Sequence, residues 1–454
     1  MLELGSFPIA RAPAIPDITS ASPPVNSMQS DSKPYVVDFS NAVPVAVENG
    51  MGTSANLGKV VSSEGERFYL KDAVSYDSTS PVVRNAITSR EVVSTEIYSL
   101  FLPAPKARMV NECSCIMEGA DNEKIFIASR LENYQDFGDC LIKEELADDL
   151  EQQFKEFTHE DAAAFKHNAV IAKTLTGELT KLRDQHLDWW VGVDGNPDQE
   201  LVQVYRAKAL QLEEVMQKQF HILPEALQRQ SQDSLGVSQL LGDWDPFNVF
   251  YKNMGIVKKG DGSLHVMRLD FGSCLDVGFQ GQTKENGYET AVSQRPAVFP
   301  ELKHRFKRED AVFSEKLPLL AQEFHTFPYA DHAQSIAGKT EWAHTTRMKI
   351  GYRCSLLMQQ KGSAQNAFET IIKTQLMNAP GFKSADDLIQ VLHARMDALI
   401  DKQCGGSHKI MEWEQNNPEL SGAIRADLLS RLSIPTVPLV KTQTHSYPIG
   451  FIKS

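Results

Sequence analysis

Two short stretches carry residues whose types and spacing suit one chemistry. The first, Gly-Asp-Trp-Asp-Pro-Phe-Asn at residues 242–248, places Asp243 and Asn248 five positions apart in an expected loop. The second, Arg-Leu-Asp-Phe-Gly at residues 268–272, ends an apolar strand on Asp270. An acid beside the acceptor, with an Asn and a second acid that face bound metal, is the minimal set for moving the γ-phosphoryl group of ATP. The two stretches together predict phosphotransfer.

Each of these three side chains has an expected role. Asp243 would accept, or at least orient, the proton of the acceptor hydroxyl, while Asn248 and Asp270 would hold Mg²⁺, or Mn²⁺, with ATP. Mg²⁺ prefers hard oxygen ligands and keeps several waters, so two side chains and the phosphates suffice. The competing interpretation is a pair of loop-capping residues and a chance Asp-Phe-Gly. A hairpin turn at 260–262 and a strand at 264–269 separate the two motifs, and this favours the catalytic interpretation.

A lysine upstream would complete the phosphate contacts. Lys71 ends the apolar run Phe-Tyr-Leu-Lys, and its ammonium could bridge the α- and β-phosphates of ATP. The competing interpretation is an exposed strand lysine. Its ion-pair partner must come from the following helix, where Glu91 and Glu96 both qualify by residue type. Helical geometry separates the two by about 140°, so only one of them can face Lys71.

Two further segments would surround the nucleotide. In the Asn-Gly-Met-Gly-Thr-Ser loop at 49–54, backbone N–H groups would lie over the phosphates because glycine allows close approach. The candidate contacts in that loop are Gly50, Gly52, Thr53 and Ser54. A simple hairpin turn is the competing interpretation. Arg130 and Leu131 follow an apolar strand, in a segment where backbone groups would contact the adenine.

Turn residues and apolar periodicity predict the elements that position these side chains. A hairpin is expected from strands at 58–61 and 67–71, followed by a helix over Pro81 to Leu102 and apolar stretches at 107–110 and 125–129. Amphipathic patterns at 139–180 and 200–232 predict helices, as does most of 300–432. The expected organisation is a disordered leader (1–34), a β-rich lobe (35–138), a helical lobe (139–434) and an irregular tail (435–454).

The order of these features resembles the protein-kinase-like superfamily over roughly residues 40–290. The loop Gly-Asp-x-x-Pro-x-Asn looks like that of the aminoglycoside- and choline-kinase branch, which lacks the His-Arg-Asp of ordinary protein kinases. The resemblance implies an α+β, bilobal fold with a small β-rich N-lobe, a larger helical C-lobe, and ATP and Mg²⁺ between them. The family's five-residue spacing favours Asp243 over its neighbour Asp245. The interval to the Pro-Ala-Pro that ends the helix favours Glu91 over Glu96.

The predicted function is Mg-ATP-dependent phosphotransfer to a hydroxyl, most simply on a protein substrate. Similar sequences occur among atypical kinases that bacterial pathogens deliver into host cells, which implies an effector made in the bacterial cytoplasm and then exported. Three alternatives stay open: a small-molecule or phosphoinositide kinase, nucleotidyl transfer from ATP, and a nucleotide-binding scaffold without turnover. The complete set of Lys, Glu, Asp, Asn and Asp weakens the last of these.

Composition limits the partners. The chain of 454 residues has a formal net charge of −13 and 42% apolar residues, so no nucleic-acid partner is expected. No run approaches the roughly 18 apolar residues of a membrane-spanning helix, and the N-terminus lacks the pattern of a cleavable secretory signal. Six scattered cysteines predict reduced thiols. A basic cluster would suit a phosphate-rich activator or another anionic ligand: Lys303, Arg305, Lys307 and Arg308.

Asp276 lies six residues after Asp270 and is the other acid near the second motif. Its closeness to a candidate metal ligand allows either a metal-binding or a structural role.

Overall fold

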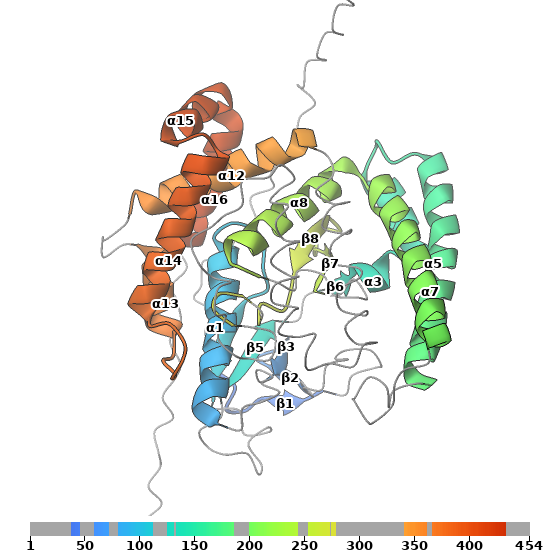
Figure 1. Cartoon of the computed structure of the whole chain (residues 1–454), viewed down its shortest axis with the longest axis horizontal. Helices are drawn as coiled ribbons and strands as arrows, with labels where there is room; N and C mark the ends of the chain where they lie inside the picture. Colours follow the sequence, from blue (N-terminus) through green and yellow to red (C-terminus); the bar gives the residue numbers. More distant parts are fainter. Residues whose placement is uncertain are drawn as a thin grey trace, which may run out of the picture.

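The computed structural model describes residues 38–45, 59–71, 80–111, 125–130, 133–185, 199–243, 253–272, 274–277, 340–360 and 366–432. These residues form an α+β fold with a small antiparallel sheet in the N-terminal part and a larger helical C-terminal part (Figure 1). This arrangement confirms the fold class expected from the sequence and is consistent with a kinase-like bilobal fold. The expected leader and tail lie outside the described residues.

The N-terminal sheet is antiparallel, with strand order β1-β2-β3-β5-β4. The predicted hairpin is confirmed: β2 and β3 pair across Glu64 and Gly65, which both have positive φ, as a tight two-residue turn requires. Lys71, the last residue of β3, is the register partner of Ile127. The strand bounds are β1 Val43–Pro44, β2 Lys59–Ser63, β3 Glu66–Lys71, β4 Ala107–Val110 and β5 Phe126–Arg130.

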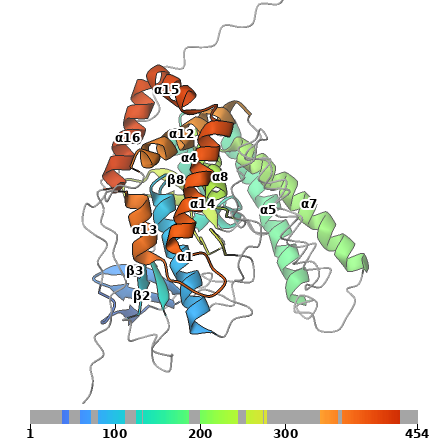
Figure 2. The same cartoon turned by 60° about the vertical axis from the view of Figure 1, so that its left-hand side comes forward.

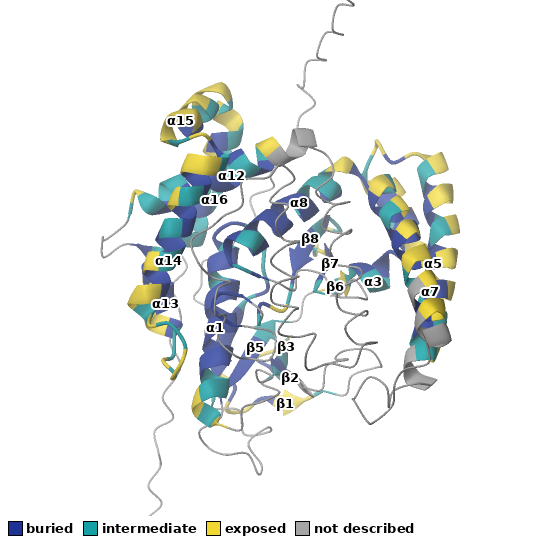
Figure 3. Ribbon diagram, viewed as in Figure 1, coloured by how far each residue is buried: buried dark blue, intermediate teal, exposed yellow. Residues whose placement is uncertain are grey.

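One helix, α1 (Pro81–Ser99), packs along this sheet and is buried over most of its length (Figure 3). Pro81 stands at its first turn, where the missing N–H costs nothing and the fixed φ favours helix. The helix ends three residues earlier than the predicted Leu102, because residues 100–102 form a turn before Pro103. Val92 of α1 lies in one apolar cluster with Ala107 and Met109 of β4 and Ile127 of β5.

A second antiparallel sheet follows, with strand order β6-β7-β8. Residues 131–133 connect β5 of the first sheet directly to β6 of the second, so this short link joins the two parts of the fold. At Gly255 a Cβ atom would come within 2.0 Å of the Gln135 carbonyl oxygen, so β6 and β7 approach closely only because this residue is glycine. The strands are β6 Tyr134–Asp136, β7 Met254–Lys258 and β8 Leu264–Arg268.

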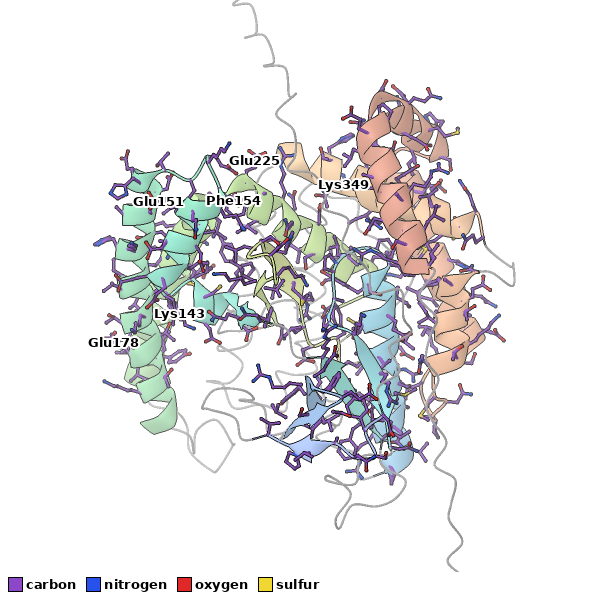
Figure 4. The ribbon with its side chains drawn as sticks, turned by 180° about the vertical axis from the view of Figure 1, so that it is seen from behind. Lys143, Glu151, Phe154, Glu178, Glu225 and Lys349 are labelled. Carbon is purple, nitrogen blue, oxygen red and sulfur yellow. The ribbon has the colours of Figure 1, made fainter. Side chains whose placement is uncertain are left out.

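The long helices α5 and α7 form an antiparallel hairpin on one side of the molecule (Figure 1). An ion pair of 2.7 Å joins Glu178 of α5 (labelled in Figure 4) to Lys208 of α7. The amphipathic region 200–232 is not one helix, because Pro224 separates α7 from α8. The helix α8 extends to Leu240, eight residues beyond the predicted end at residue 232. The bounds are α3 Phe137–Cys140, α4 Glu145–Gln153, α5 His159–Gln185, α7 Gln199–Ile222 and α8 Glu225–Leu240.

Among the last helices, α13 packs against α1, α12 and α14 pack against α8, and α15 and α16 pack against α12 (Figure 2). They share one large apolar core with α1, α8 and the second sheet. The four cysteines in the described part of the chain are buried, and none of them forms a disulfide there. Within the same part, no helix is both long and apolar enough to span a bilayer. The bounds are α12 Thr340–Met358, α13 Ala367–Gln375, α14 Ala385–Ala398, the π-helix η1 Leu399–Gln403, α15 Ser407–Asn416 and α16 Pro418–Leu432.

Candidate active site

Lys71 lies at the centre of a cluster that joins the two parts of the fold. Its Nζ is 2.7 Å from Glu91 Oε1 and 2.9 Å from Asp270 Oδ1. The end of β3 supplies the lysine, the buried face of α1 supplies Glu91, and the segment after β8 supplies Asp270. Glu91, and not Glu96, is therefore the helix residue that meets Lys71. Lys71 and Glu91 are largely buried, whereas half of the Asp270 side chain is exposed.

Lys71, Glu91 and Asp270 shift one another's pKa values. Burial alone would lower the pKa of Lys71, but the carboxylates of Asp270 and Glu91 outweigh it and raise that pKa, so the ammonium stays charged. Burial raises the pKa of Glu91 to about 7, with Lys71 acting in the opposite direction. Burial would raise the pKa of Asp270, but the charge and hydrogen bond of Lys71, together with the Arg268 charge and the Gly272 N–H, hold it below its ordinary value. Asp270 is therefore ionised at neutral pH.

The backbone at Asp270 has an unusual conformation that aims its carboxylate. Its φ is +56°, in the left-handed region that Asp tolerates better than most residues. Gly272 then passes so close that a Cβ atom there would lie 3.1 Å from Glu91 Oε2 and 3.4 Å from Asp270 Oδ1. A side chain at position 272 would press on two members of the cluster. A Cβ atom at this position would therefore require the Glu91 carboxylate to shift by a few tenths of an ångström.

Phe271 fixes this segment against α1. Its ring is 1% exposed and lies 4.9 Å from the ring of Tyr98, centroid to centroid. The hydroxyl of Tyr98 is 2.6 Å from Ser234 Oγ on α8. Tyr98 therefore links the Asp-Phe-Gly segment to α8, with the Phe side chain in the core and the Asp side chain toward Lys71.

Asp243 occupies a different environment from the one its predicted role suggests. Its side chain is fully buried and forms an ion pair with Arg268, with 2.6 Å between Arg268 Nη2 and Asp243 Oδ2. Arg268 also donates to the carbonyl oxygen of Asn253 at 2.9 Å and lies over the Phe271 ring. The pair ties the start of the 242–248 loop to the strand that leads into Asp270.

The position of Asp243 is set by the end of α8. Gly242, with φ +67°, stops the helix in the left-handed conformation that glycine allows, and the N–H of Asp243 bonds to the carbonyl of Ser238 at 2.9 Å. The buried Arg395 of α14 donates to the carbonyl oxygens of Gln239 and Leu240. Since the last carbonyls of a helix have no partner within it, this arginine caps α8 just before the loop.

Arg130 is not brought to the Lys71 cluster. Its side chain forms an ion pair of 3.2 Å with Glu66, and the residue pairs with Phe68, three register positions from the partner of Lys71. Backbone groups of the 127–137 segment remain the expected adenine contacts. The other predicted site residues lie outside the described residues: Gly50, Gly52, Thr53, Ser54, Leu131, Asn248, Asp245, and the basic cluster Lys303, Arg305, Lys307 and Arg308.

The donors in this cluster fit a magnesium nucleotide. Asp270 offers a half-exposed, ionised carboxylate with only one oxygen engaged by Lys71, and a hard anionic oxygen of this kind is what Mg²⁺ requires. Lys71 supplies a fixed positive charge beside it. No group of three or more His, Cys, Asp or Glu side chains that could hold a metal occurs in the described part of the chain. A site completed by nucleotide phosphates and Asn248 does not need such a group.

Sequence reasoning missed two arginines that hold this site. Arg268 interrupts the apolar run Val-Met-Arg-Leu just before Asp270, and Arg90 directly precedes Glu91. A charged residue inside an otherwise buried strand or helix face must have a partner, and this was the available signal. The partner of Arg90 is Asp276, so the role of Asp276 in the structure is an ion pair and not a contact with the Lys71 cluster.

Comparisons with known proteins add little to this geometry. No protein-family profile matches the chain, and no curated protein matches it. Among solved structures, the chain is similar to the crystal structure of a Helicobacter pylori proinflammatory kinase, CtkA, with 12% sequence identity and a TM-score of 0.33. That match covers 81% of this chain and 96% of the other.

Proposed function

We propose that the chain is an Mg-ATP-dependent phosphotransferase that acts on a hydroxyl group. The observation that carries this proposal is the cluster of Lys71, Glu91 and Asp270, with contacts of 2.7 and 2.9 Å at the Lys71 ammonium. Two sheets and a helix converge on this lysine, and a buried lysine with two carboxylates is the arrangement that kinase-type phosphate binding uses. A structural ion pair would not need one carboxylate to remain half exposed.

Each residue has a proposed task. Lys71 would contact the α- and β-phosphates, Glu91 would hold Lys71 in place, and Asp270 with Asn248 would hold Mg²⁺. ATP would supply the phosphoryl group, and the metal would neutralise charge that develops during transfer. Positioning and electrostatics would provide most of the rate, since the transferred group needs little covalent help.

Asp243 is proposed to orient the loop that presents the acceptor hydroxyl. Its carboxylate is buried and bound to Arg268, so orientation fits its environment better than free exchange of protons with water. In a loose transition state, the acceptor proton need not leave early, and a positioned hydroxyl suffices.

Two further points are proposed: which group accepts the phosphate and where the protein acts. A protein hydroxyl is the proposed acceptor, and the proposed setting is that of an effector delivered into a host cell. Both rest on the motif resemblance of the Gly-Asp-x-x-Pro-x-Asn loop. Host-cell lysate, phosphoinositide vesicles and an aminoglycoside, offered in parallel, distinguish the acceptor classes.

The test compares two labels on the same preparations. Wild type with Mg²⁺ and [γ-³²P]ATP should label itself or an acceptor, and Asp270→Ala should reduce labelling by about 100-fold or more. Asp261→Ala is the matched control, because it removes an exposed carboxylate at the other end of β8. Label transferred from [α-³²P]ATP would instead establish nucleotidyl transfer. ATP that raises the melting temperature without any transfer would establish the scaffold alternative.

A further inference from the structure

Arg90 is a fully engaged arginine that lies directly before Glu91 in α1, and its side chain is 1% exposed. A guanidinium has five N–H donors, and here the contacts provide five acceptors. Nε donates to Asp276 Oδ1 (2.6 Å), Nη1 to the carbonyls of Ala86 (3.2 Å) and Met377 (3.1 Å), and Nη2 to Asp276 Oδ2 (3.3 Å) and the carbonyl of Lys383 (2.9 Å). The orientation of this side chain is therefore determined completely.

Asp276 belongs to the segment that follows Asp-Phe-Gly, six residues after Asp270. Its side chain is 0% exposed, and in addition to Arg90 it accepts a hydrogen bond from the N–H of Lys383 at 2.8 Å. The preceding Leu275 bonds through its N–H to the carbonyl of Leu241 at 2.8 Å, beside the 242–248 loop. The segment that carries Asp276 therefore contacts the end of α8, directly before the 242–248 loop.

The third component is the connection between α13 and α14, residues 377–383. Its Met377 N–H donates to Ser89 Oγ of α1 at 3.0 Å, and its Phe382 ring lies 4.4 Å from the Arg90 guanidinium. Phe382 also packs with Ile87 and Val277 in a small apolar cluster. This segment therefore covers the Arg90–Asp276 pair and excludes water from it.

These contacts constrain Glu91 through its neighbour. Adjacent helical residues differ by about 100° around the axis, so Arg90 and Glu91 face different sides of α1 and move together. Rotating α1 enough to take Glu91 off Lys71 would pull Arg90 away from Asp276. A buried charge would then lose its partner, which is strongly unfavourable.

We propose that Arg90, Asp276 and the 377–383 segment form a preformed brace that holds Glu91 on Lys71, so that the site is assembled without phosphorylation of the chain. In regulated kinases, the corresponding ion pair is put in place by a phosphorylated residue that binds arginine. Here the carboxylate of Asp276 binds Arg90 in place of a phosphate group, and it needs no modification to do so. Arg90 and Asp276 are positioning residues, and this assignment rests on the proposed function of the Lys71 cluster.

The first test measures the full-length chain without nucleotide. Asp276→Asn should increase amide hydrogen exchange in residues 84–92 of α1 by about tenfold or more, because the helix loses its charged anchor. The control is Asp233→Asn, which removes a partly buried ion pair between α8 and Lys349 of α12 (labelled in Figure 4) and should leave that exchange unchanged. Equal exchange in the two variants would overturn the proposal.

The second test asks whether Asp276 acts through Glu91. Asp276→Asn should lower kcat/KM for ATP by about tenfold or more, and the same change in a Glu91→Gln background should have almost no further effect. Phe382→Leu, which keeps the apolar packing but removes the ring from Arg90, should give a smaller loss with the same dependence on Glu91. Equal losses in both backgrounds would show a merely structural role.

A third test addresses phosphorylation. Treatment of the purified protein with a broad-specificity phosphatase, followed by removal of the phosphatase, should leave kcat/KM within about twofold. A large loss would overturn the idea that the brace replaces a phosphorylated residue. Should the wild type transfer no γ-phosphate at all, the proposed function fails, while the exchange experiment still decides whether the brace holds α1.

Discussion

Glu91 is the residue of the cluster whose charge changes within the physiological pH range. Its pKa is raised from 4.5 to about 7, and burial is the main cause. Since Lys71 stays protonated, the ion pair between the two side chains is complete only when Glu91 is ionised. The strength of this contact is therefore expected to vary around neutral pH.

We expect kcat/KM for ATP to rise by up to about tenfold between pH 6 and pH 8, because the carboxylate of Glu91 forms over this range. The contribution of Glu91 to the free energy of unfolding changes with pH in the opposite direction, because it falls as pH rises. A proton held more tightly in the folded state gives stability that is present below pH 4.5 and is lost as pH rises through about 7. A pH–rate profile and urea unfolding of wild type and Glu91→Gln measure the two effects. A wild-type profile that matches Glu91→Gln would contradict the prediction.

At the scale of elements, buried arginines connect segments that the hydrogen bonds of helices and sheets leave separate. Arg268 binds the loop after α8 to the end of β8, and Arg90 binds α1 to the segment after Asp-Phe-Gly. Arg395 caps α8 from α14. Each of these links fixes a segment that carries a residue of the candidate site.

The Arg268–Asp243 pair makes a testable contribution to stability. Arg268→Met should lower the free energy of unfolding by about 3–5 kcal/mol, because the Asp243 carboxylate is left buried without its main partner. The double variant with Asp243→Asn should recover part of this loss. Arg425→Met, which breaks a half-exposed pair with Glu414, should cost less than about 1 kcal/mol. Urea unfolding of wild type, Arg268→Met, Asp243→Asn, the double variant and Arg425→Met measures these differences, and additivity of Arg268→Met and Asp243→Asn would refute the coupling.

Local patterns were sufficient to predict several elements and the central cluster. The turn at Glu64 and Gly65 predicted the β2–β3 hairpin, and Pro81 with apolar periodicity predicted α1. Lys71, Glu91 and Asp270 meet as the kinase-like order of motifs implied. The separation of α7 from α8 at Pro224 was present in the sequence, but the amphipathic pattern on both sides concealed it.

Contacts between distant charges could not be predicted in the same way. Arg90 and Asp276 are 186 positions apart, and no periodicity indicates which buried arginine meets which carboxylate. The burial of Asp243 also depends on packing, because its spacing to Asn248 is the same whether its side chain faces water or Arg268. Sequence spacing therefore identified residue types, and the three-dimensional structure assigned their partners.

On the scale of the whole molecule, the C-terminal helices hold α1 from behind. Arg353 donates to the carbonyl of Leu100 at 3.0 Å, and Arg431 donates to those of Ser99 at 2.6 Å and Leu102 at 3.2 Å. Both arginines bind Asp427, with N–O distances of 2.6 and 2.9 Å. The C-terminal end of α1 is thus capped by α12 and α16, while the brace holds its middle.

Because these contacts cross between the N-terminal and C-terminal parts, the described parts of the chain should unfold as one cooperative unit. Calorimetric and van't Hoff enthalpies should agree, and tryptophan fluorescence and circular dichroism should report the same midpoint. Asp427→Ala should lower the free energy of unfolding by about 1–3 kcal/mol, since both capping arginines lose their shared partner. An early, separate transition of α1 and the N-terminal sheet would contradict this expectation.

The reach of the brace along the chain has a consequence for protein synthesis. Lys383 lies 107 positions after Asp276, so the last contact of the brace is translated well after both motifs of the site. At about 5–20 residues per second, a ribosome needs roughly 5–20 s to cover this interval. A nascent chain that already contains Lys71, Glu91 and Asp270 still lacks the segment that holds α1. The proposed phosphotransfer would therefore begin only after residues 377–383 have emerged from the ribosome.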